Sequence, residues 1–339
     1  MYKNVPVNIR EKIGANLLKI ENHPLTIIKN KIVSILGESF KVFEDLNPVV
    51  TIVNNFDKLL IPMDHVSRSQ SDSYYIDDKT LLRTHTSAHQ CELLEQGERS
   101  FIVVGDVYRR DEIDCYHFPV FHQLEAVKIV SDGVDPVEDL KKTLNNLLSK
   151  LFKSENIKYT DSYFPFTEPS FEVEIEYNNK MIEVLGCGQI HSNILKSIFI
   201  NEKGWAFGLG LERLAMILFN IPDIRYFWSK DPRFLNQFEK GLDTKFVIYS
   251  KYPECTKDIS FWINQDFSAN DFYEAVREIC GDLIEDIKLK DTFSKNDRKS
   301  ECYRLTYRHN DRSLTNTEVD QKQAELRTYV QQHLPITLR

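Results

Sequence analysis

The sequence contains no closely spaced cysteines, no long apolar run and no excess of positive charge. Its six cysteines lie far apart and form no C-x-x-C pair, which argues against a zinc knuckle and against a disulfide framework. A reducing compartment is therefore expected. No apolar run approaches the roughly 20 residues that a helix needs to cross a bilayer, so we expect no membrane association. The formal net charge of −8 is not that of a uniformly basic nucleic-acid binder, so local charge matters more than the sum.

Two common nucleotide-binding fingerprints are also missing. The stretch "GWAFGLGLERLAMILF", residues 204–219, begins like a dinucleotide loop, but Arg213 stands where a third glycine is needed. There is no G-x-x-x-x-G-K-[ST] phosphate loop either. The stretch instead predicts a strand ending at Gly208 and Gly210, then a helix whose first turn carries Glu212 and Arg213. Small residues let a ligand approach the backbone, and a guanidinium there suits a phosphate or a stacked base.

What the chain does contain is enough apolar material for two domains, with 42% hydrophobic residues among 339. Residues 1–232 predict an α+β domain, a mostly antiparallel sheet flanked by helices. Residues 1–20 are expected to form its first helix rather than a targeting segment. Residues 233–244 are expected to be a linker. From 245 to 339 the order of strands and helices is compatible with a ferredoxin-like βαββαβ unit.

Caps and alternation place the main elements of the first domain. Pro24 lies at a first helical turn with Gly37 just past the end, and Asp135-Pro136 begins another helix. The helices and strands expected from these signals cover residues 24–36 and 136–153, and residues 100–108, 120–130, 170–177 and 181–186.

The segment "VYRRDEIDCYHFPVFHQLE", residues 107–125, gathers polar side chains on a strand–loop–strand unit. Arg109 ends the first strand and His117 lies in the loop. Period-two alternation puts three side chains on one face of the returning strand: Phe121, Gln123 and Glu125. A cation, an imidazole, an aromatic ring, an amide and a carboxylate together are an unusual way to build a core, so the segment predicts a binding site.

Other segments add candidates of the same kind. "LLRTHTSAHQ" contributes His85 and Ser87, and "DSYFPFTEPSFE" contributes Phe164 and Phe166. "EVLGCGQI" contributes a pair of small residues around Cys187, namely Gly186 and Gly188. Taken singly, the two phenylalanines would be core residues and His85 a structural histidine, so only their occurrence together indicates a site.

Nine segments resemble the class II aminoacyl-tRNA synthetases, and the match is close to the single-chain, mitochondrial-type phenylalanyl-tRNA synthetase family. In sequence order they are "PVVT…NFDKLLIP", "LLRTHTSAHQ", "VVGDVYRRDEID", "FHQLEAV", "YFPFTEPSFE", "EVLGCG", "GWAFGLGLERLAMIL", "IPDIRYFW" and "NDFYEAVREICGDL". The quoted segments lie between residues 48 and 283. The resemblance as a whole extends from about residue 22 to residue 312, nearly the whole chain.

This resemblance implies roles in binding ATP. Arg109 would hold the α-phosphate and the substrate carboxylate, and His117 would lie near the distal phosphates. Phe121 and Arg213 would sandwich the adenine ring, beside space cleared by Gly210. Magnesium would bridge the phosphates, with Glu183 and Glu125 as candidate ligands. Arg109, His117, Glu125 and Arg213 are thus the expected catalytic group.

The resemblance also implies a pocket for L-phenylalanine. His85, Ser87, Gln123 and Glu125, with Arg109, would hold the α-amino and carboxyl groups. The phenyl ring would meet Phe164 and Phe166, with Ala206 as the floor. Gly186, Cys187 and Gly208 would complete the wall. A dry pocket without a hydroxyl partner would disfavour tyrosine, because burying an unpaired hydroxyl costs roughly 2–7 kcal/mol.

Residues 245–339 look like the anticodon-binding domain of the same family. Between residues 288 and 312 there are eight cations and four anions, in a chain that is acidic overall. Expected contacts to tRNA(Phe) are Lys295, Arg298, Lys299, Arg308 and Arg312. Phe261, Trp262, Tyr303 and Tyr307 are either base-stacking residues or core residues.

Together these expectations describe an ATP-dependent phenylalanine–tRNA ligase that acts as a monomer, with ATP and Mg²⁺ as cofactors and without an editing site of its own. The alternative is a tRNA-binding paralogue that has lost catalysis. The resemblance implies the mitochondrial matrix as the location, with the cytoplasm as the alternative.

Overall fold

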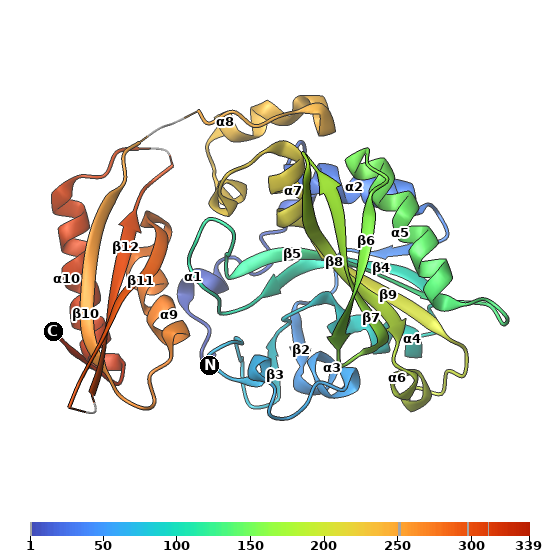
Figure 1. Ribbon diagram of the computed structural model, residues 1–339, viewed down its shortest axis with the longest axis horizontal. Helices are drawn as coiled ribbons and strands as arrows, with labels where there is room; N and C mark the ends of the chain where they lie inside the picture. The colour runs from blue at the N-terminus through green and yellow to red at the C-terminus, as the bar shows by residue number, and fades with distance from the viewer. Residues whose placement is uncertain (1, 250–251, 297, 311) are drawn as a thin grey trace.

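The computed structural model describes residues 2–249, 252–296, 298–310 and 312–339, which form two lobes, each built on its own sheet (Figure 1). The larger sheet has seven strands in the order β1-β4-β5-β9-β8-β7-β6. Only the β1–β4 pair among them is parallel. These strands are β1 Lys41–Phe43, β4 Ser100–Tyr108, β5 Val120–Ile129, β6 Ile157–Phe164, β7 Thr167–Tyr177, β8 Lys180–Ile190 and β9 Gly204–Gly210. The predicted antiparallel sheet is confirmed.

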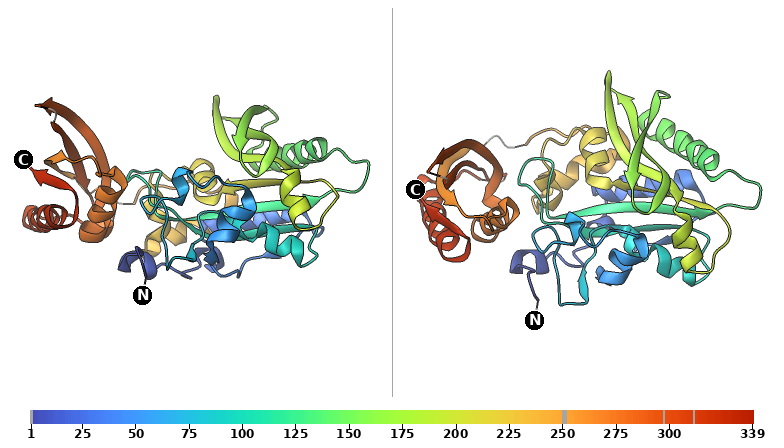
Figure 2. Two further views of the ribbon diagram at one scale, coloured as in Figure 1. Left: turned by 90° about the horizontal axis from the view of Figure 1, so that it is seen from below. Right: turned by 60° about the horizontal axis from the view of Figure 1, so that its bottom comes forward.

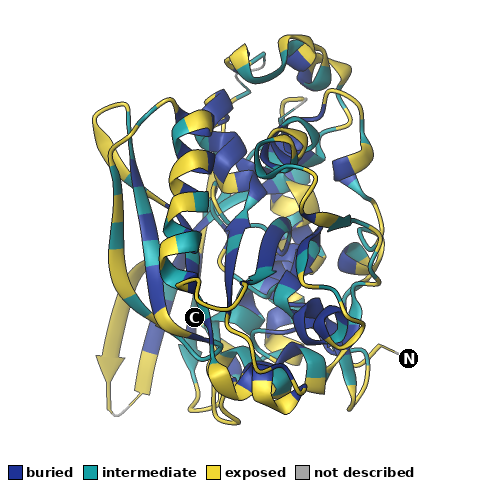
Figure 3. Ribbon diagram, turned by 90° about the vertical axis from the view of Figure 1, so that its right-hand side faces the viewer, coloured by how far each residue is buried: buried dark blue, intermediate teal, exposed yellow. Residues whose placement is uncertain are grey.

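Three helices cover one face of this sheet: α2 Pro24–Leu36, α5 Pro136–Phe152 and α7 Leu211–Phe219. The Asp135 carboxylate caps α5 by accepting from the Val137 and Glu138 N–H groups at 2.7 and 3.1 Å. The leucines of α5 recur every three or four positions and are buried, as Figure 3 shows for the inner sides of the helices. The predicted boundaries of α2 are confirmed, and α5 ends at Phe152, one residue before the predicted end, because Lys153 adopts a left-handed conformation.

The opposite face of the sheet is only partly covered. Short helices pack on one end of it through a second apolar cluster that includes Val103, Val127 and Ala206. They are α3 Ile52–Asn55, α4 Gln90–Glu95 and α6 Ser192–Ser197, accompanied by the small sheet of β2 Val49–Thr51 and β3 Thr80–Leu82. The rest of that face carries the polar residues of β5.

Two predictions for this domain need correction. The described residues 2–20 form α1 Val7–Arg10 and a 3-10 turn instead of one continuous helix, because Gly14 and Asn16 adopt positive φ angles and break the helix. Residues 233–244 are not a free linker. They contain most of α8 Pro232–Leu235 and a further 3-10 segment, and they insert Phe234 and Phe238 fully into the core beneath α7.

The smaller lobe has the predicted βαββαβ order, with its four strands arranged β11-β12-β10-β13. Its elements are β10 Cys255–Ile263, α9 Ala269–Cys280, β11 Ile284–Lys295, β12 Arg298–Tyr307, α10 Asn316–His333 and β13 Ile336–Leu338. Both helices pack on one face of this sheet around Phe261, Tyr303 and Leu305. Tyr303 and Tyr307, like Phe261, are therefore core residues.

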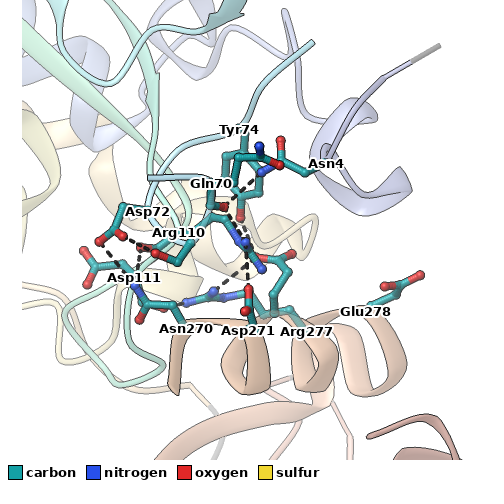
Figure 4. A network of polar contacts seen from close by, with 12 residues as sticks. Asn4, Gln70, Asp72, Tyr74, Arg110, Asp111, Asn270, Asp271, Arg277 and Glu278 are labelled. Atoms are coloured by element: carbon teal, nitrogen blue, oxygen red, sulfur yellow. Dashed lines mark hydrogen bonds and ion pairs between the residues drawn. The ribbon is translucent and has the colours of Figure 1, made fainter. Parts of the chain in front are cut away.

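The loop between β4 and β5 reaches across to the smaller lobe (Figures 1 and 2). Arg110 pairs with Asp271 and Glu274 of α9 at 3.0 and 3.6 Å, and the Tyr74 hydroxyl donates to Glu274 at 2.7 Å (Figure 4). Arg277 of α9 donates back to the carbonyl of Glu112 at 2.8 Å, and Ile113 is buried in the core of the smaller lobe.

A second contact between the lobes centres on Arg225. Its guanidinium pairs with Asp223 at 2.7 Å and donates to the carbonyls of Ile284 and Arg308, both at 3.1 Å. A cleft of about 440 Å³ adjoins this contact. Within the described ranges, no helix is both long and apolar enough to cross a bilayer.

Candidate active site

The floor of the candidate site is a row of aligned residues across three strands. Glu125 of β5 pairs in register with Gly208 of β9, which pairs with Gly186 of β8. A Cβ built on Gly208 or on Gly210 would meet nothing within 4 Å, so there is open space above both. A Cβ on Gly186 would lie 2.9 Å from the Phe164 ring, so only glycine allows that ring to lie against the sheet.

Glu125 is a buried carboxylate at one end of this floor, with 2% of its surface exposed. The Thr86 hydroxyl donates to it at 3.3 Å. Burial raises the pKa of Glu125 to about 7, against the lowering effect of hydrogen bonds from Ser87 and Thr86. Thr86 also donates its N–H to the Gln123 side chain at 3.3 Å, so the segment 84–87 and β5 form one polar wall.

Arg109 supplies the cation of the site. Its Nε donates to the Thr84 carbonyl at 2.8 Å, and its guanidinium lies 5.2 Å from the centre of the Phe121 ring. Burial lowers the pKa of Arg109, and nearby Asp111 partly offsets this. Among the residues that the structure describes, no carboxylate lies within ion-pairing distance of Arg109. The segment 84–87 therefore contacts both a cation, at the Thr84 carbonyl, and an acid, at the Thr86 hydroxyl, and the two charges do not pair with each other.

His85 lies against the aromatic side of the pocket, its ring centre 6.3 Å from that of Phe166. Both ring nitrogens are buried, and in the described part of the chain neither has a hydrogen-bond partner. Burial, followed by the charge of Arg109, lowers the pKa of His85 to about 3, so this ring is neutral. A buried unpaired imidazole facing a polar ligand site can accept or donate one hydrogen bond to that ligand.

Phe164 and Phe166 lie side by side with their ring centres 5.9 Å apart and their planes 13° apart. Phe166 packs against the cluster that contains Ala206, so the structure brings the predicted aromatic wall and floor together. The prediction that Cys187 lies in the pocket wall is wrong. It alternates with Gly186 and Gly188, so its side chain points to the opposite face and is buried in the core beneath α5. Burial raises the pKa of its thiol to about 12.

Arg213 and Glu183 lie at the open end of the floor, half-exposed, 3.5 Å apart. His117 lies in the loop between β4 and β5, where a hydrogen bond from its ring to Asp114 at 2.9 Å raises the pKa of His117. The predicted pair of metal ligands does not converge. Strand β9 separates Glu125 on β5 from Glu183 on β8, so the two strands lie about 10 Å apart, and Glu183 is also three residues along β8 from Gly186, the position aligned with Glu125.

The sequence did not predict one buried pair behind the site. Glu212 accepts from the backbone N–H of His122 at 2.8 Å, and its other oxygen lies 2.7 Å from His122 Nδ1. Both residues are almost fully buried. The two positions are 90 residues apart in sequence, and no local pattern connects them.

Comparison with known proteins gives the family. Residues 6–238 match the family described as tRNA synthetases class II core domain (F), and residues 250–339 match the ferredoxin-fold anticodon binding domain. The phenylalanine–tRNA ligase, chloroplastic/mitochondrial, of Arabidopsis thaliana is 51% identical, covering 99% of this chain and 82% of that protein. The mitochondrial enzyme of Dictyostelium discoideum is 43% identical, with coverages of 99% and 89%.

This chain belongs to the phenylalanine–tRNA ligases of class II. A solved pyrrolysyl-tRNA synthetase from Desulfitobacterium hafniense shares the fold of the core, with a TM-score of 0.50 and 17% identity over 66% of this chain and 79% of that one. The predicted family, fold class and enzyme class are confirmed. Several of the relatives are named mitochondrial, and by this resemblance the predicted mitochondrial location is confirmed as well.

The anticodon-binding domain of this ligase separates the predicted tRNA contacts into two groups. Lys295, Arg298 and Lys299 lie at the exposed tip of the β11–β12 hairpin. Arg308 instead pairs with Glu254 at 2.9 Å and faces the cleft between the lobes, and Arg312 pairs with Glu318. These two arginines are engaged in the protein's own contacts, as is Lys299, which pairs with Glu301 at 2.8 Å.

Near the hairpin tip, an aromatic and cationic cluster lies on the sheet face away from α9 and α10. Trp262 and Phe293 both align with Ser300 between them, with ring centres 6.1 Å apart. The Arg298 guanidinium lies 4.7 Å from the Trp262 ring centre, and that of Arg339 lies 5.0 Å from the Phe293 ring centre. We call these four residues the Trp262 cluster.

Proposed function

We propose that this ligase activates L-phenylalanine with ATP to phenylalanyl-adenylate and pyrophosphate, and transfers the phenylalanyl group to the terminal 2′-hydroxyl of tRNA(Phe). The observation that carries the proposal is that the part-buried Arg109 and the buried Glu125 form no ion pair with each other and lie beside an open glycine floor. An amino acid is a zwitterion, and a site that offers one free cation and one free acid is complementary to it. The aromatic wall of Phe164 and Phe166 suits a phenyl side chain.

In this mechanism Glu125, with Gln123 and Ser87, holds the α-ammonium group, and His85 makes a further hydrogen bond at the pocket wall. Arg109 orients the α-carboxylate toward the α-phosphate and stabilises the charge that develops as the carboxylate oxygen attacks phosphorus. Phe121 and Arg213 hold the adenine ring, with space above Gly210, and His117 lies near the distal phosphates. No side chain forms a covalent intermediate.

Mg²⁺ would neutralise charge on the phosphates during this step. Glu183 fits such a role because its carboxylate is exposed at the open end of the floor, where a hydrated ion can reach it. Glu125 does not fit, because it is buried and separated from Glu183 by β9. We therefore retain Glu183 as the proposed ligand and assign Glu125 to the ammonium group.

The experiment that tests this function is phenylalanine-dependent exchange of pyrophosphate into ATP, followed by charging of tRNA(Phe). Exchange is expected with phenylalanine and at least 10²-fold less with tyrosine, because an apolar pocket rejects an added hydroxyl to about that extent. The absence of exchange with any amino acid would instead indicate a tRNA-binding paralogue without catalysis. Gel filtration of the active protein tests the proposed monomer.

The two matched domains, residues 6–238 and 250–339, are proposed to carry no editing site, since they match a synthetase core and an anticodon-binding domain. Preformed Tyr-tRNA(Phe) is expected to be hydrolysed no faster with the ligase than in buffer alone. The measurement is the first-order loss of radiolabelled tyrosyl ester, with a ligase that edits as the positive control. A rate constant above that of buffer would disprove this statement.

Ala206 is proposed to limit the depth of the phenyl pocket. Removing its methyl group in Ala206→Gly is expected to admit para-chloro- and para-bromo-phenylalanine, raising kcat/KM for these analogues about tenfold or more relative to phenylalanine, since one methylene corresponds to roughly 1–3 kcal/mol. Ala126→Gly is the matched control, because Ala126 is equally buried but packs on the helix-covered face. If both variants gave the same kcat/KM for these analogues, Ala206 would not be the residue that limits the depth of the phenyl pocket.

The Trp262 cluster is proposed to stack on unpaired bases of the anticodon loop. Base stacking on an aromatic residue is worth about 1–3 kcal/mol, so Trp262→Ala is expected to weaken tRNA binding roughly tenfold while leaving pyrophosphate exchange unchanged. Phe199→Ala is the control, because Phe199 is a highly exposed aromatic residue on the other domain. Affinities for tRNA(Phe) measured by filter binding at one fixed salt concentration decide this, and unchanged binding in Trp262→Ala contradicts it.

A further inference from the structure

We propose that Glu212 and His122 are positioning residues that set the separation of the adenine-binding side chains Phe121 and Arg213. This inference rests on the proposed function of those two residues. Each member of the pair is the chain neighbour of one side of the proposed sandwich: His122 follows Phe121 on β5, and Glu212 precedes Arg213 on α7.

The pair replaces a missing strand contact. The ladder between β5 and β9 ends where Gln123 aligns with Gly210, and β9 then gives way to α7. The next N–H group of β5, that of His122, is accepted by the Glu212 carboxylate at 2.8 Å. A side chain in the first turn of α7 thus continues the sheet by one hydrogen bond and joins the helix to the strand.

The second carboxylate oxygen of Glu212 makes the contact between α7 and β5 more rigid. It lies 2.7 Å from His122 Nδ1, so two bonds converge on one side chain and fix its direction as well as its distance. The His122 ring is buried beside Trp228, with ring centres 6.1 Å apart. The carboxylate lies within the first turn of α7, where the helix dipole favours a negative charge.

Neither side chain of the pair enters the site. His122 alternates with Phe121 and Gln123 and so projects to the other side of β5, and Glu212 is 3% exposed whereas Arg213 is exposed. The pair therefore acts through its neighbours. Loss of the hydrogen bonds between Glu212 and His122 should affect adenine binding more than amino-acid binding, because Glu125 is held separately by Thr86 and Ser87.

The test compares wild type, Glu212→Ala and Glu212→Gln in pyrophosphate exchange, with KM measured separately for ATP and for phenylalanine. Glu212→Ala is expected to raise KM for ATP about tenfold or more and to change KM for phenylalanine less than threefold. Glutamine can accept from the His122 N–H and donate to Nδ1 in the other tautomer, so Glu212→Gln is expected to remain within threefold of wild type for both substrates.

A double-mutant cycle separates positioning from general stability. In an Arg213→Ala background, Glu212→Ala is expected to raise KM for ATP less than threefold further, because the side chain that it positions is already gone. Lys29→Met is the control for loss of a buried ion pair elsewhere, with Glu44 at 2.9 Å, and should lower Tm without changing KM for ATP. His122→Phe replaces the imidazole by a phenyl ring, which removes the Nδ1 contact and keeps the backbone N–H, and is expected to raise KM for ATP a few-fold. This variant provides the test if Glu212→Ala does not fold.

Three results would overturn the inference: unchanged KM for ATP in both Glu212→Ala and His122→Phe, an equal rise in both KM values, or additive effects with Arg213→Ala. These outcomes differ from failure of the proposed function, in which the wild-type protein itself shows no exchange. An active wild type supports the proposed function. A rise in KM for ATP in Glu212→Ala that is selective for ATP and not additive with Arg213→Ala supports the inference as well.

Discussion

Glu125→Gln is expected to bind phenylalanine at least about 30-fold more weakly than wild type and yet to be the more stable protein at pH 8. The loss of binding follows from removing a buried charge opposite the substrate ammonium group, an interaction worth roughly 2–5 kcal/mol. The gain in stability follows from the pKa of about 7, above the value of 4.5 for an unperturbed glutamate. A carboxyl group with a raised pKa favours the folded state when protonated, so stability falls as the pH rises from about 4.5 to 7.

The size of this effect is about 3 kcal/mol at most, from the difference between the two pKa values. Glutamine is neutral at every pH and removes this dependence. Thermal unfolding of ligand-free protein between pH 5 and 8 should therefore show wild type losing stability relative to Glu125→Gln. Glu172→Gln is the matched control, since Glu172 aligns with Gly186 in the same row but is only half-buried. Parallel stability curves for wild type and Glu125→Gln would contradict the expectation.

The same titration makes phenylalanine binding depend on pH. Glu125 must lose its proton to hold an ammonium group, so affinity should decrease about tenfold per pH unit below pH 7 and level off above it. Binding near pH 6.5 should release a proton, which calorimetry in buffers of different ionisation enthalpy detects.

Arg109→Ala is expected to lower kcat/KM for pyrophosphate exchange about 10³-fold. Loss of a single oriented donor to a developing oxyanion typically costs about 10²–10³ in rate, and Arg109 is proposed to serve both the carboxylate and the phosphate. Arg109→Lys should recover little, because an ammonium group cannot both donate to the Thr84 carbonyl and present two parallel N–H groups. Steady-state exchange kinetics at saturating and limiting ATP measure this.

The neighbouring arginine provides the control for Arg109. Arg110 is part-buried like Arg109, but it is paired with Asp271 and Glu274 of α9. Arg110→Ala should keep exchange within about threefold of wild type and weaken the contact between the domains. Comparable losses in the two variants would mean that Arg109 acts through loop structure and not through the substrate.

Much of this architecture could be predicted from the sequence where the signal is local. Asp135-Pro136 specifies the start of α5, and alternation along residues 120–129 puts Phe121, Gln123 and Glu125 on one face. Cys187 was assigned to the pocket although the same alternation, applied between Gly186 and Gly188, puts it on the other face. Phe234 and Phe238 are likewise large apolar residues, which are unusual in an exposed linker, and both are fully buried.

Other features depend on contacts between distant parts of the chain. Several acidic residues in the sequence could pair with Arg308 or Arg312. Only the fold shows that Arg308 pairs with Glu254 and that Arg312 pairs with Glu318. Glu212 and His122 meet only because β9 ends beside β5. The pKa of Glu125 depends on how completely the segment 84–87 covers it, which no local pattern encodes.

The loop between β4 and β5 is part of both domains at once. The Ile113 side chain is buried in the smaller lobe and its carbonyl accepts from the Ile287 N–H at 3.0 Å, while His117, four residues on, is proposed to lie near the distal phosphates of ATP. If that proposal holds, whatever moves the smaller lobe changes the free energy of nucleotide binding at this loop. Because linkage is reciprocal, any factor by which an anticodon alters the affinity for ATP must reappear as the same factor by which ATP alters the affinity for tRNA.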